Sequence, residues 1–237
     1  MNLSLLLTGN IAPQKVPFLK RMDFVQREND YYEALQKWME YDIPIVFCEN
    51  SNFNSIKINK LFEVRPDCEY LKFETQKSIL GKGNGEAEIF EFAFKNSKIL
   101  KKANYICKVT GRYNIINFKA IQKKLKNSDF LISANMTDNL SWADSRFFIF
   151  QNSFYNLFLR EALSTLNESN NICFEHCLAR AIHKAMSQSF PFRLLPELPI
   201  YQGVYGGENI RYDNNWIRLV KNKIFSYCKK YFFESLI

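Results

Sequence analysis

The sequence contains few of the residues that form long loops and tight turns. Its 237 residues include only 8 glycines and 7 prolines, which disfavours a loop-rich scaffold or a sandwich of many short strands. No apolar run approaches the ~20 residues that a membrane-spanning helix requires. The apolar stretch 1–7 carries no basic residue and stops at Thr8-Gly9-Asn10, which is not typical of a secretory signal. We therefore expect a protein that is neither exported nor embedded in a membrane.

The six cysteines show no C-x-x-C spacing. Most of them lie inside apolar runs, such as the run that ends at Cys48. Buried, reduced thiols fit this placement, and they predict a cytoplasmic location.

Hydrophobic and aromatic residues are abundant, at 47% and 16% of the chain. The length fits one domain of ordinary size, and we expect residues 1–213 to form it. The 32 Lys and Arg outnumber the 24 Asp and Glu, which gives a formal net charge of +8. That charge favours an anionic partner, and nucleic acid, anionic lipid and a diphosphate substrate all qualify.

Short apolar runs alternate with amphipathic segments along the chain. The predicted strands are 3–7, 44–48, 69–73, 105–109, 130–133 and 146–150. The predicted helices are 27–41, with Asn29 or Asp30 as N-cap, then 86–96, 152–166 and 173–186. This order predicts an α/β fold with a mainly parallel sheet, flanked by helices and followed by a helical C-terminal part.

Four polar segments each follow a predicted strand directly or shortly after it. They would meet at the carboxyl edge of the sheet, where ligands bind in folds of this kind. The candidate binding residues in the segments that follow the first two strands are Thr8, Gly9, Asn10, Glu49 and Asn50. In the other two segments they are Lys82, Gly83, Gly85, Gly111, Arg112 and Tyr113.

The segment Gly81-Lys-Gly-Asn-Gly85 precedes a predicted helix. Its glycines would let backbone N–H groups approach an oxyanion, and Lys82 would add positive charge. It is not a Walker A loop, and Glu86 stands where a dinucleotide-binding fingerprint needs its third glycine. A flexible loop that only leads into the helix is the alternative.

Lys108 and Arg112 lie at the end of the fourth predicted strand and just beyond it. This arrangement is typical of a clamp for phosphate or carboxylate, although a surface ion pair would also explain Arg112. Arg27 could reach the same edge from the segment after the first strand.

A carboxylate in the turn at Asp144, with Asp138 six residues earlier, can hold Mg²⁺ or Mn²⁺ against a diphosphate. A simple turn former is the alternative. On the helix 173–186, Glu175 is a candidate general base and His176 a candidate metal ligand. The spacing C-x-E-H-C matches no zinc pattern, so zinc is disfavoured.

The last segment, 214–237, is predicted to be a basic amphipathic helix. Such a helix can lie in an anionic membrane surface. A helix packed on the domain, with its lysines in solvent, is the alternative.

With these motifs in place, the sequence resembles the small bacterial glycosyltransferases encoded in lipopolysaccharide, lipooligosaccharide and capsule gene clusters. The resemblance covers most of residues 3–180. The motifs that carry it are Leu5-Leu-Leu-Thr-Gly-Asn10, Arg27-x-x-x-Tyr31, Val46-Phe-Cys-Glu-Asn-Ser51, Gly81-Lys-Gly-Asn-Gly-Glu86, Lys108-Val-Thr-Gly-Arg-Tyr113, Asp144-Ser-Arg146 and Phe174-Glu-His176.

The resemblance implies a GT-A-like, Rossmann-type fold that transfers a sugar from a nucleotide sugar to a saccharide hydroxyl of a lipid-linked acceptor. It implies Glu175 as the base, with Glu86 as second choice. Lys82, Lys108 and Arg112 would stabilise the departing nucleoside diphosphate. Arg146 replaces the second acid of the family's Asp-x-Asp motif and could neutralise the diphosphate in place of a metal. The tail would hold the enzyme at the inner face of the cytoplasmic membrane.

Two other functions stay open at this point. Another nucleotide-using transferase, such as a nucleotidyltransferase, would use the same loops. A nucleic-acid-binding module would explain the net charge, but the lysines are spread along the chain and no recognised binding motif is present.

Overall fold

The computed structural model describes residues 2–212, except residues 15, 18 and 138, together with residues 220, 224 and 228. The predicted tail helix at 214–237, apart from those three residues, and Asp138 therefore lie outside the described residues. Among the residues that are described, no helix combines the length and the apolar character needed to cross a membrane.

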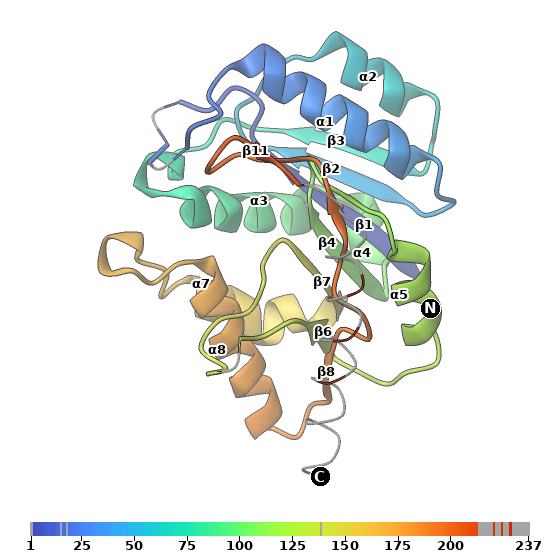
Figure 1. The fold of residues 1–237 in the computed structure, drawn as a ribbon, viewed down its shortest axis with the longest axis vertical. Coiled ribbons are helices and arrows are strands. Elements are labelled where there is room, and N and C mark those ends of the chain that lie inside the picture. Colours follow the sequence, from blue (N-terminus) through green and yellow to red (C-terminus); the bar gives the residue numbers. More distant parts are fainter. Residues whose placement is uncertain are drawn as a thin grey trace.

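A seven-stranded sheet forms the centre of the molecule (Figure 1). Its strands lie in the order β3-β2-β1-β4-β7-β6-β8, and all are parallel except β7, which runs antiparallel to both of its neighbours. The strands are β1 (Leu3–Gly9), β2 (Ile45–Glu49), β3 (Cys68–Lys72), β4 (Tyr105–Thr110), β6 (Ile132–Ala134), β7 (Phe147–Gln151) and β8 (Phe192–Leu194). The mainly parallel α/β fold is confirmed, whereas β8 was not predicted.

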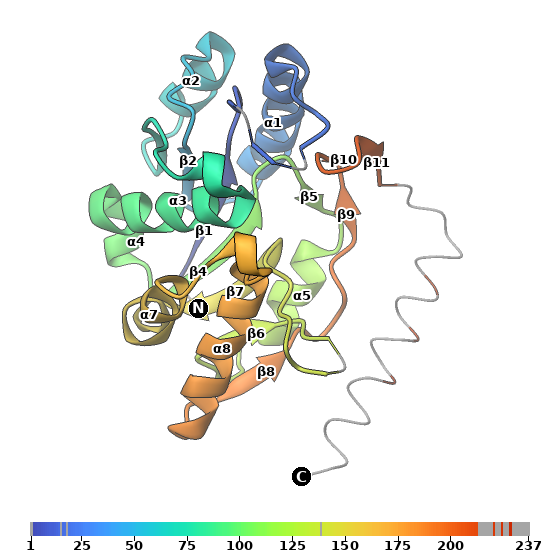
Figure 2. The same cartoon turned by 90° about the vertical axis from the view of Figure 1, so that its left-hand side faces the viewer.

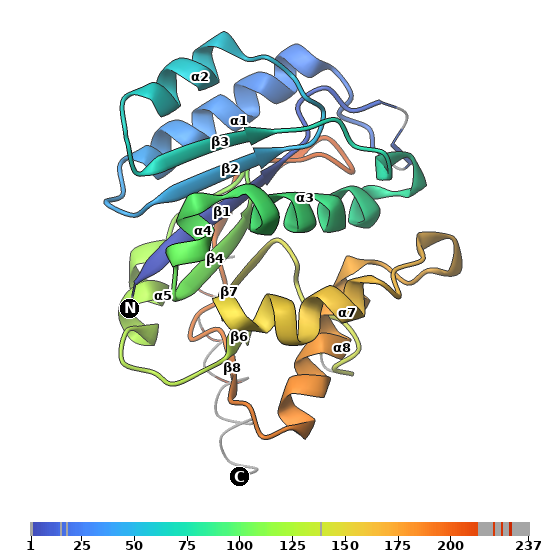
Figure 3. The same cartoon turned by 180° about the vertical axis from the view of Figure 1, so that it is seen from behind.

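Helices cover both faces of the sheet because the side chains of β1 alternate between two apolar clusters. Leu5 and Leu7 belong to the same cluster as Trp38, while Leu6 belongs to the cluster of Phe90. The first face carries α1 (Phe24–Met39), α2 (Ile56–Glu63) and α5 (Phe118–Leu125). The second face, turned towards the viewer in Figure 3, carries α3 (Lys82–Asn96), α4 (Lys98–Lys102), α6 (Asn152–Phe154), α7 (Arg160–Leu163) and α8 (Phe174–Ser187).

The helices differ from the predictions mainly at their ends. Helix α1 begins at Phe24 because the Asp23 carboxylate accepts a hydrogen bond from the Gln26 N–H at 2.7 Å, so neither Asn29 nor Asp30 is its cap. The predicted helix 152–166 is instead α6, a π-helical stretch over Tyr155–Leu159, and α7. The short helices α2, α4 and α5 were missed, because eight residues or fewer give little periodic signal.

After α8 and β8 the chain returns to the carboxyl ends of the strands, which the sequence did not indicate. Here β9 (Tyr201–Gln202) pairs with β5 (Asn114–Ile115), and β10 (Val204–Tyr205) pairs with β11 (Ile210–Arg211) to form a hairpin. The hairpin lies against the segment before α1, where the N–H groups of Lys20 and Arg21 both donate to Gly206 O at 3.2 Å (Figure 2).

Candidate active site

A cavity of about 390 Å³ opens at the carboxyl ends of β1, β2 and β4. The helix after β1 and the helix after β3 lie on opposite faces of the sheet, which makes this edge the crevice where ligands bind in doubly wound folds. Because β7 is antiparallel, the residues before it reach the same edge. The predicted site residues that line the cavity are Thr8, Gly9, Asn10, Arg27, Asn50, Lys82, Gly85, Glu86, Arg112, Tyr113, Asp144, Arg146 and Glu175.

Close approach of the backbones after β1 and β4 shapes the floor of the cavity. The Gly111 N–H donates to Thr8 O at 2.8 Å, and a Cβ atom on Gly111 would lie 2.8 Å from the same oxygen. Only glycine fits there without moving the backbone. Gly111 is therefore needed for the shape of the site, and it does not itself line the cavity.

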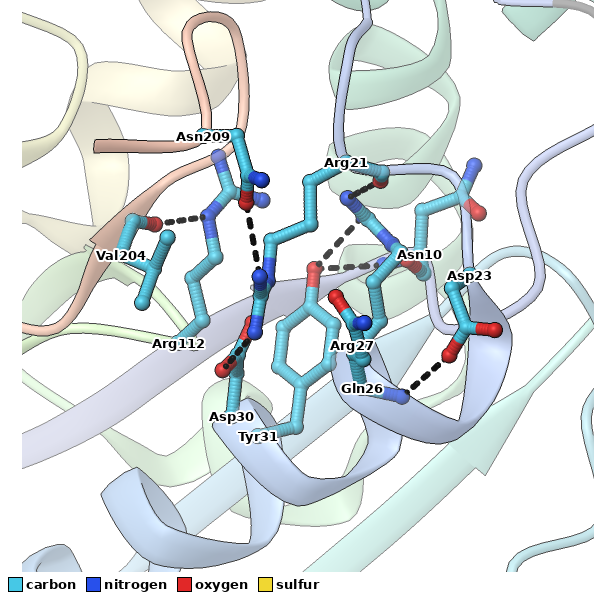
Figure 4. Close-up of polar contacts among 10 residues, drawn as sticks. All are labelled: Asn10, Arg21, Asp23, Gln26, Arg27, Asp30, Tyr31, Arg112, Val204 and Asn209. Atoms are coloured by element: carbon cyan, nitrogen blue, oxygen red, sulfur yellow. Dashed lines mark hydrogen bonds and ion pairs between the residues drawn. The ribbon is translucent and has the colours of Figure 1, made fainter. Parts of the chain in front are cut away.

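Arg27 and Arg112 form what we call the arginine wall of the cavity. Arg27 is almost fully buried, with 2% of its surface exposed. Its Nε donates to Asn10 O at 2.8 Å, and its Nη1 donates to Arg21 O at 3.1 Å (Figure 4). The Tyr31 hydroxyl lies 3.4 Å from Nη2. All of these partners are uncharged, so they leave the positive charge of Arg27 unbalanced.

Arg112 donates from Nε to Val204 O at 3.0 Å, again to an uncharged partner. Among the described residues, no carboxylate forms an ion pair with Arg27 or Arg112, whereas Arg21 beside them pairs with Asp30 at 2.6 Å. The arginine wall therefore carries two positive charges that no described carboxylate contacts directly, and the nearby Asp30, which acts on the charge of Arg27, is itself paired with Arg21. A ligand with negative charge would satisfy them.

The pKa values of Arg27 and Lys82 are lowered by burial and by the neighbouring positive charges. Burial lowers the pKa of Arg27, and the nearby charge of Arg112 lowers it further. Partial burial and the charge of Arg112 also lower the pKa of Lys82, at the mouth of the cavity. Burial acts in the same direction on Arg112, but the adjacent Tyr113 and Tyr31 hydroxyls raise its pKa above the usual value. The three cations repel one another and would be relieved by an anion.

A second group of side chains, which we call the carboxylate network, lines the cavity through Thr8, Glu86, Ser145 and Glu175. Glu86 Oε1 accepts hydrogen bonds from Thr8 Oγ1 at 2.8 Å and from Lys108 Nζ at 2.6 Å. Lys108 Nζ also donates to Ser145 O. Ser145 Oγ in turn donates to Glu175 Oε1 at 2.7 Å. The network thus connects both candidate bases through one buried lysine.

Lys108 does not contact the cavity, contrary to the predicted clamp. It lies in the middle of the sheet with no exposed surface, and its ammonium group forms an ion pair with Glu86. Glu49 is also fully buried and does not line the cavity. Its carboxylate accepts from the N–H groups of Ile11 and Ser51 at 2.8 and 2.9 Å, so it joins the loops after β1 and β2. Burial raises the pKa of Glu49 against the effect of these hydrogen bonds.

The glycine-rich segment is helical from Lys82 onward rather than a loop. The carboxylate of Glu168, from the short 3-10 helix Glu168–Asn170, accepts a hydrogen bond from the Asn84 N–H at 3.1 Å. A Cβ atom on Gly81 would lie 1.9 Å from Glu168 Oε2. Gly83 packs against Phe174 and does not line the cavity. The first turn of α3 therefore binds a carboxylate of the chain itself, as the charge at a helix N-terminus favours.

The predicted metal ligands do not gather into a metal site. Asp144 is held on both oxygens by Arg146, with Nε–Oδ1 at 2.8 Å and Nη2–Oδ2 at 2.7 Å, and the Tyr201 hydroxyl donates to Oδ2 at 3.1 Å. His176 Nδ1 lies 3.1 Å from Cys173 Sγ. Within the described part of the chain, no group of three or more acidic, histidine or cysteine side chains could hold a metal ion. These residues do not fit the predicted Mg²⁺ or Mn²⁺ site.

Sequence reasoning missed part of the cavity lining. Tyr205, Gly207 and Tyr212 line the cavity from a segment that was not predicted to reach it, and Trp142 lines it from the turn before Asp144. The cluster of glycines and tyrosines over 201–212 is a signal of turns. It could have revealed a hairpin, but not its position at the strand ends.

Comparison with known proteins shows the fold and no family. No protein-family model matches the chain. No curated protein matches it either. The chain is similar to the structure of the inositol-1-phosphate CTP transferase from T. maritima, with a TM-score of 0.52, 13% identity, and coverage of 89% of this chain and 92% of that one.

Two further structures are less similar. A cytidylyltransferase from Leptospira borgpetersenii serovar Hardjo-bovis (strain JB197) gives a TM-score of 0.48 and 13% identity, covering 84% of this chain and 77% of that one. The glycosyltransferase GlyE from Streptococcus pneumoniae TIGR4 gives a TM-score of 0.48 and 8% identity, covering 81% of this chain and 45% of that one. The Rossmann-like fold class is thus confirmed by the first of the three structures.

Proposed function

We propose that the protein is a glycosyltransferase that moves a sugar from a nucleotide-sugar donor to a saccharide hydroxyl of a surface-glycan precursor. The observation that carries this proposal is the arginine wall at the strand ends. Arg27 and Arg112 offer two unbalanced positive charges to a diphosphate. The leaving group of a nucleotide sugar gains negative charge as its bond to the sugar breaks, so fixed cations there would lower the barrier.

Glu175 is the proposed general base. Its Oε1 accepts a hydrogen bond from the neutral Ser145 hydroxyl, whereas Glu86 is already ion-paired with Lys108. In the proposed reaction, Glu175 takes the proton of the acceptor hydroxyl and the acceptor oxygen bonds to the anomeric carbon. The bond from that carbon to the donor phosphate oxygen breaks, and the nucleoside diphosphate leaves with the electron pair.

The resemblance to enzymes of lipopolysaccharide and capsule synthesis supports a lipid-linked acceptor, used at the cytoplasmic side of the membrane. The segment 214–237 is proposed to bind that membrane surface. Deleting it should release the protein from anionic vesicles while nucleotide binding persists. Retention of the shortened protein on the vesicles would refute this role of the segment.

Nucleotidyl transfer is the second candidate, and the fold of the inositol-1-phosphate CTP transferase favours it. The two reactions differ in their small product. Sugar transfer releases a nucleoside diphosphate, whereas transfer of a nucleotide to a phosphorylated acceptor releases pyrophosphate. Both would use an anion site at the strand ends.

A thermal-shift titration with UDP, GDP, CDP and CMP tests the proposal, since a ligand that binds only the native state raises the unfolding midpoint. We expect a shift with one nucleoside diphosphate, and its loss in Arg112→Gln. Arg193→Gln on β8, an exposed arginine away from the cavity, is the matched control and should keep the shift. If a folded protein shifts with none of the nucleotides, the transferase proposal fails.

A further inference from the structure

Trp142 is an exposed aromatic residue at the rim of the cavity. It has 37% of its surface exposed, in contrast with the fully buried Trp38. Trp142 lines the main cavity and also a shallow hollow beside it. The other described residues of that hollow are Thr137, Asn139, Ser141 and His176.

The indole ring of Trp142 packs against His176, and hydrogen bonds fix the backbone on either side of it. The ring of His176 meets it edge-on, with centroids 5.1 Å apart and an angle of 82° between the planes. The Trp142 backbone carbonyl accepts from the Thr137 N–H at 2.9 Å, and the next N–H, of Ala143, donates to Glu175 O at 3.2 Å. The ring is therefore part of a small platform fixed to the first turn of α8, and not a free surface side chain.

The chemistry of the hollow differs from that of the main cavity. Apart from Trp142 and His176, its described lining consists of hydroxyl and amide side chains, and none of the described lining residues is Lys, Arg, Asp or Glu. A sugar ring has an apolar C–H face that can lie on an aromatic ring, and hydroxyl groups that pair with such side chains. A phosphorylated ligand would instead need cations, which lie in the arginine wall.

The hollow adjoins the part of the main cavity where the proposed base, Glu175, lies. His176 lines the hollow and its neighbour Glu175 lines the main cavity, with Trp142 bordering both. A sugar lying on Trp142 would therefore lie at the border of the cavity that Glu175 lines.

We propose that Trp142, with Thr137, Asn139, Ser141 and His176, forms the subsite for a neutral saccharide acceptor. The role as acceptor site rests on the proposed glycosyl transfer, but saccharide binding itself does not. A neutral acceptor also favours sugar transfer over nucleotidyl transfer to a phosphate, since the hollow has no described side chain to bind that phosphate.

A glycan microarray of neutral and phosphorylated bacterial saccharides, probed with the labelled full-length protein in the presence of UDP, GDP, CDP and CMP, tests the subsite. We expect binding to neutral saccharides that weakens at least tenfold in Trp142→Ala and is largely restored in Trp142→Phe. Phe24→Ala is the matched control, because Phe24 is an exposed aromatic residue that lines neither hollow. A thermal shift with the nucleotide should persist in all four proteins, because the arginine wall is unchanged in each of them.

Three results would overturn the proposed subsite. These are a wild type that binds no saccharide on the array, a wild type that binds phosphorylated saccharides alone, and binding to neutral saccharides that is the same in Trp142→Ala. Failure of the proposed function looks different. In that case no nucleotide shifts the unfolding midpoint, while the dependence of saccharide binding on Trp142 can still be measured.

Discussion

The carboxylate network and the arginine wall differ in how their charges are balanced. In the carboxylate network, the charge of Glu86 is met by Lys108 at 2.6 Å, and Glu175 is met by a hydroxyl. In the arginine wall, Arg27 and Arg112 contact only uncharged partners among the described residues. Buried charges that a protein leaves unbalanced are costly, so the wall indicates a site that a ligand completes. The network instead holds its own members in place.

The largest effect is expected on the carboxylate side. Glu175→Gln keeps an oxygen to accept from Ser145 but removes the proton acceptor, so turnover should fall by about 10³-fold. Nucleotide binding should not change. Release of nucleoside diphosphate, measured with the acceptor that the saccharide screen identifies, checks this. Glu86→Gln is the comparison, and a greater loss there would make Glu86 the base.

Removal of Lys108 breaks the balance within the network. Lys108→Met would leave the Glu86 carboxylate without its buried cation, which should lower the free energy of unfolding by about 4 kcal/mol. Urea denaturation measures the change. The exposed pair Lys184–Glu161, at 2.6 Å, provides the matched control, and Lys184→Met should cost less than about 1 kcal/mol. Equal effects at the two sites would show that Lys108 has no special structural role.

Substitution of Arg112 in the arginine wall should lower the activity of the protein and leave its stability nearly unchanged. Arg112→Ala removes a charge that no described carboxylate balances, so folding loses little, while the reaction barrier should rise by about 3 kcal/mol. Turnover would then fall by about 150-fold, and Arg193→Ala should leave it unchanged. Near-normal turnover in Arg112→Ala would remove this residue from the site.

The sequence predicted the part of the site that parallel strands build. Thr8, Asn50 and Arg112 follow apolar runs that are easy to recognise as strands, and parallel strands bring their carboxyl ends together. That rule depends only on the order of strands and helices along the chain. It therefore gave the fold class and most of the residues around the cavity.

The sequence does not predict which side chain forms an ion pair with each charged residue of the site. Arg146 is paired with Asp144, and Lys108 with Glu86, which lies 22 positions earlier on a helix. The pair of Lys108 and Glu86 depends on how α3 packs on β4, and no spacing along the chain reports that. The hairpin over Val204–Arg211 was missed for a similar reason, because two-residue strands carry almost no periodic pattern.

The smallest effect tests whether the network acts as one unit. Ser145→Ala removes the hydroxyl that holds Glu175, while the Ser145 backbone oxygen can still accept from Lys108. We expect a loss of about 1 kcal/mol in transition-state stabilisation, or about fivefold in turnover, because one hydrogen bond is removed. If Ser145 acts only by positioning Glu175, the double variant Ser145→Ala/Glu175→Gln should be no slower than Glu175→Gln alone. Additive losses would mean that Ser145 contributes through another contact, and the proposed link between the two carboxylates would have no part in the reaction.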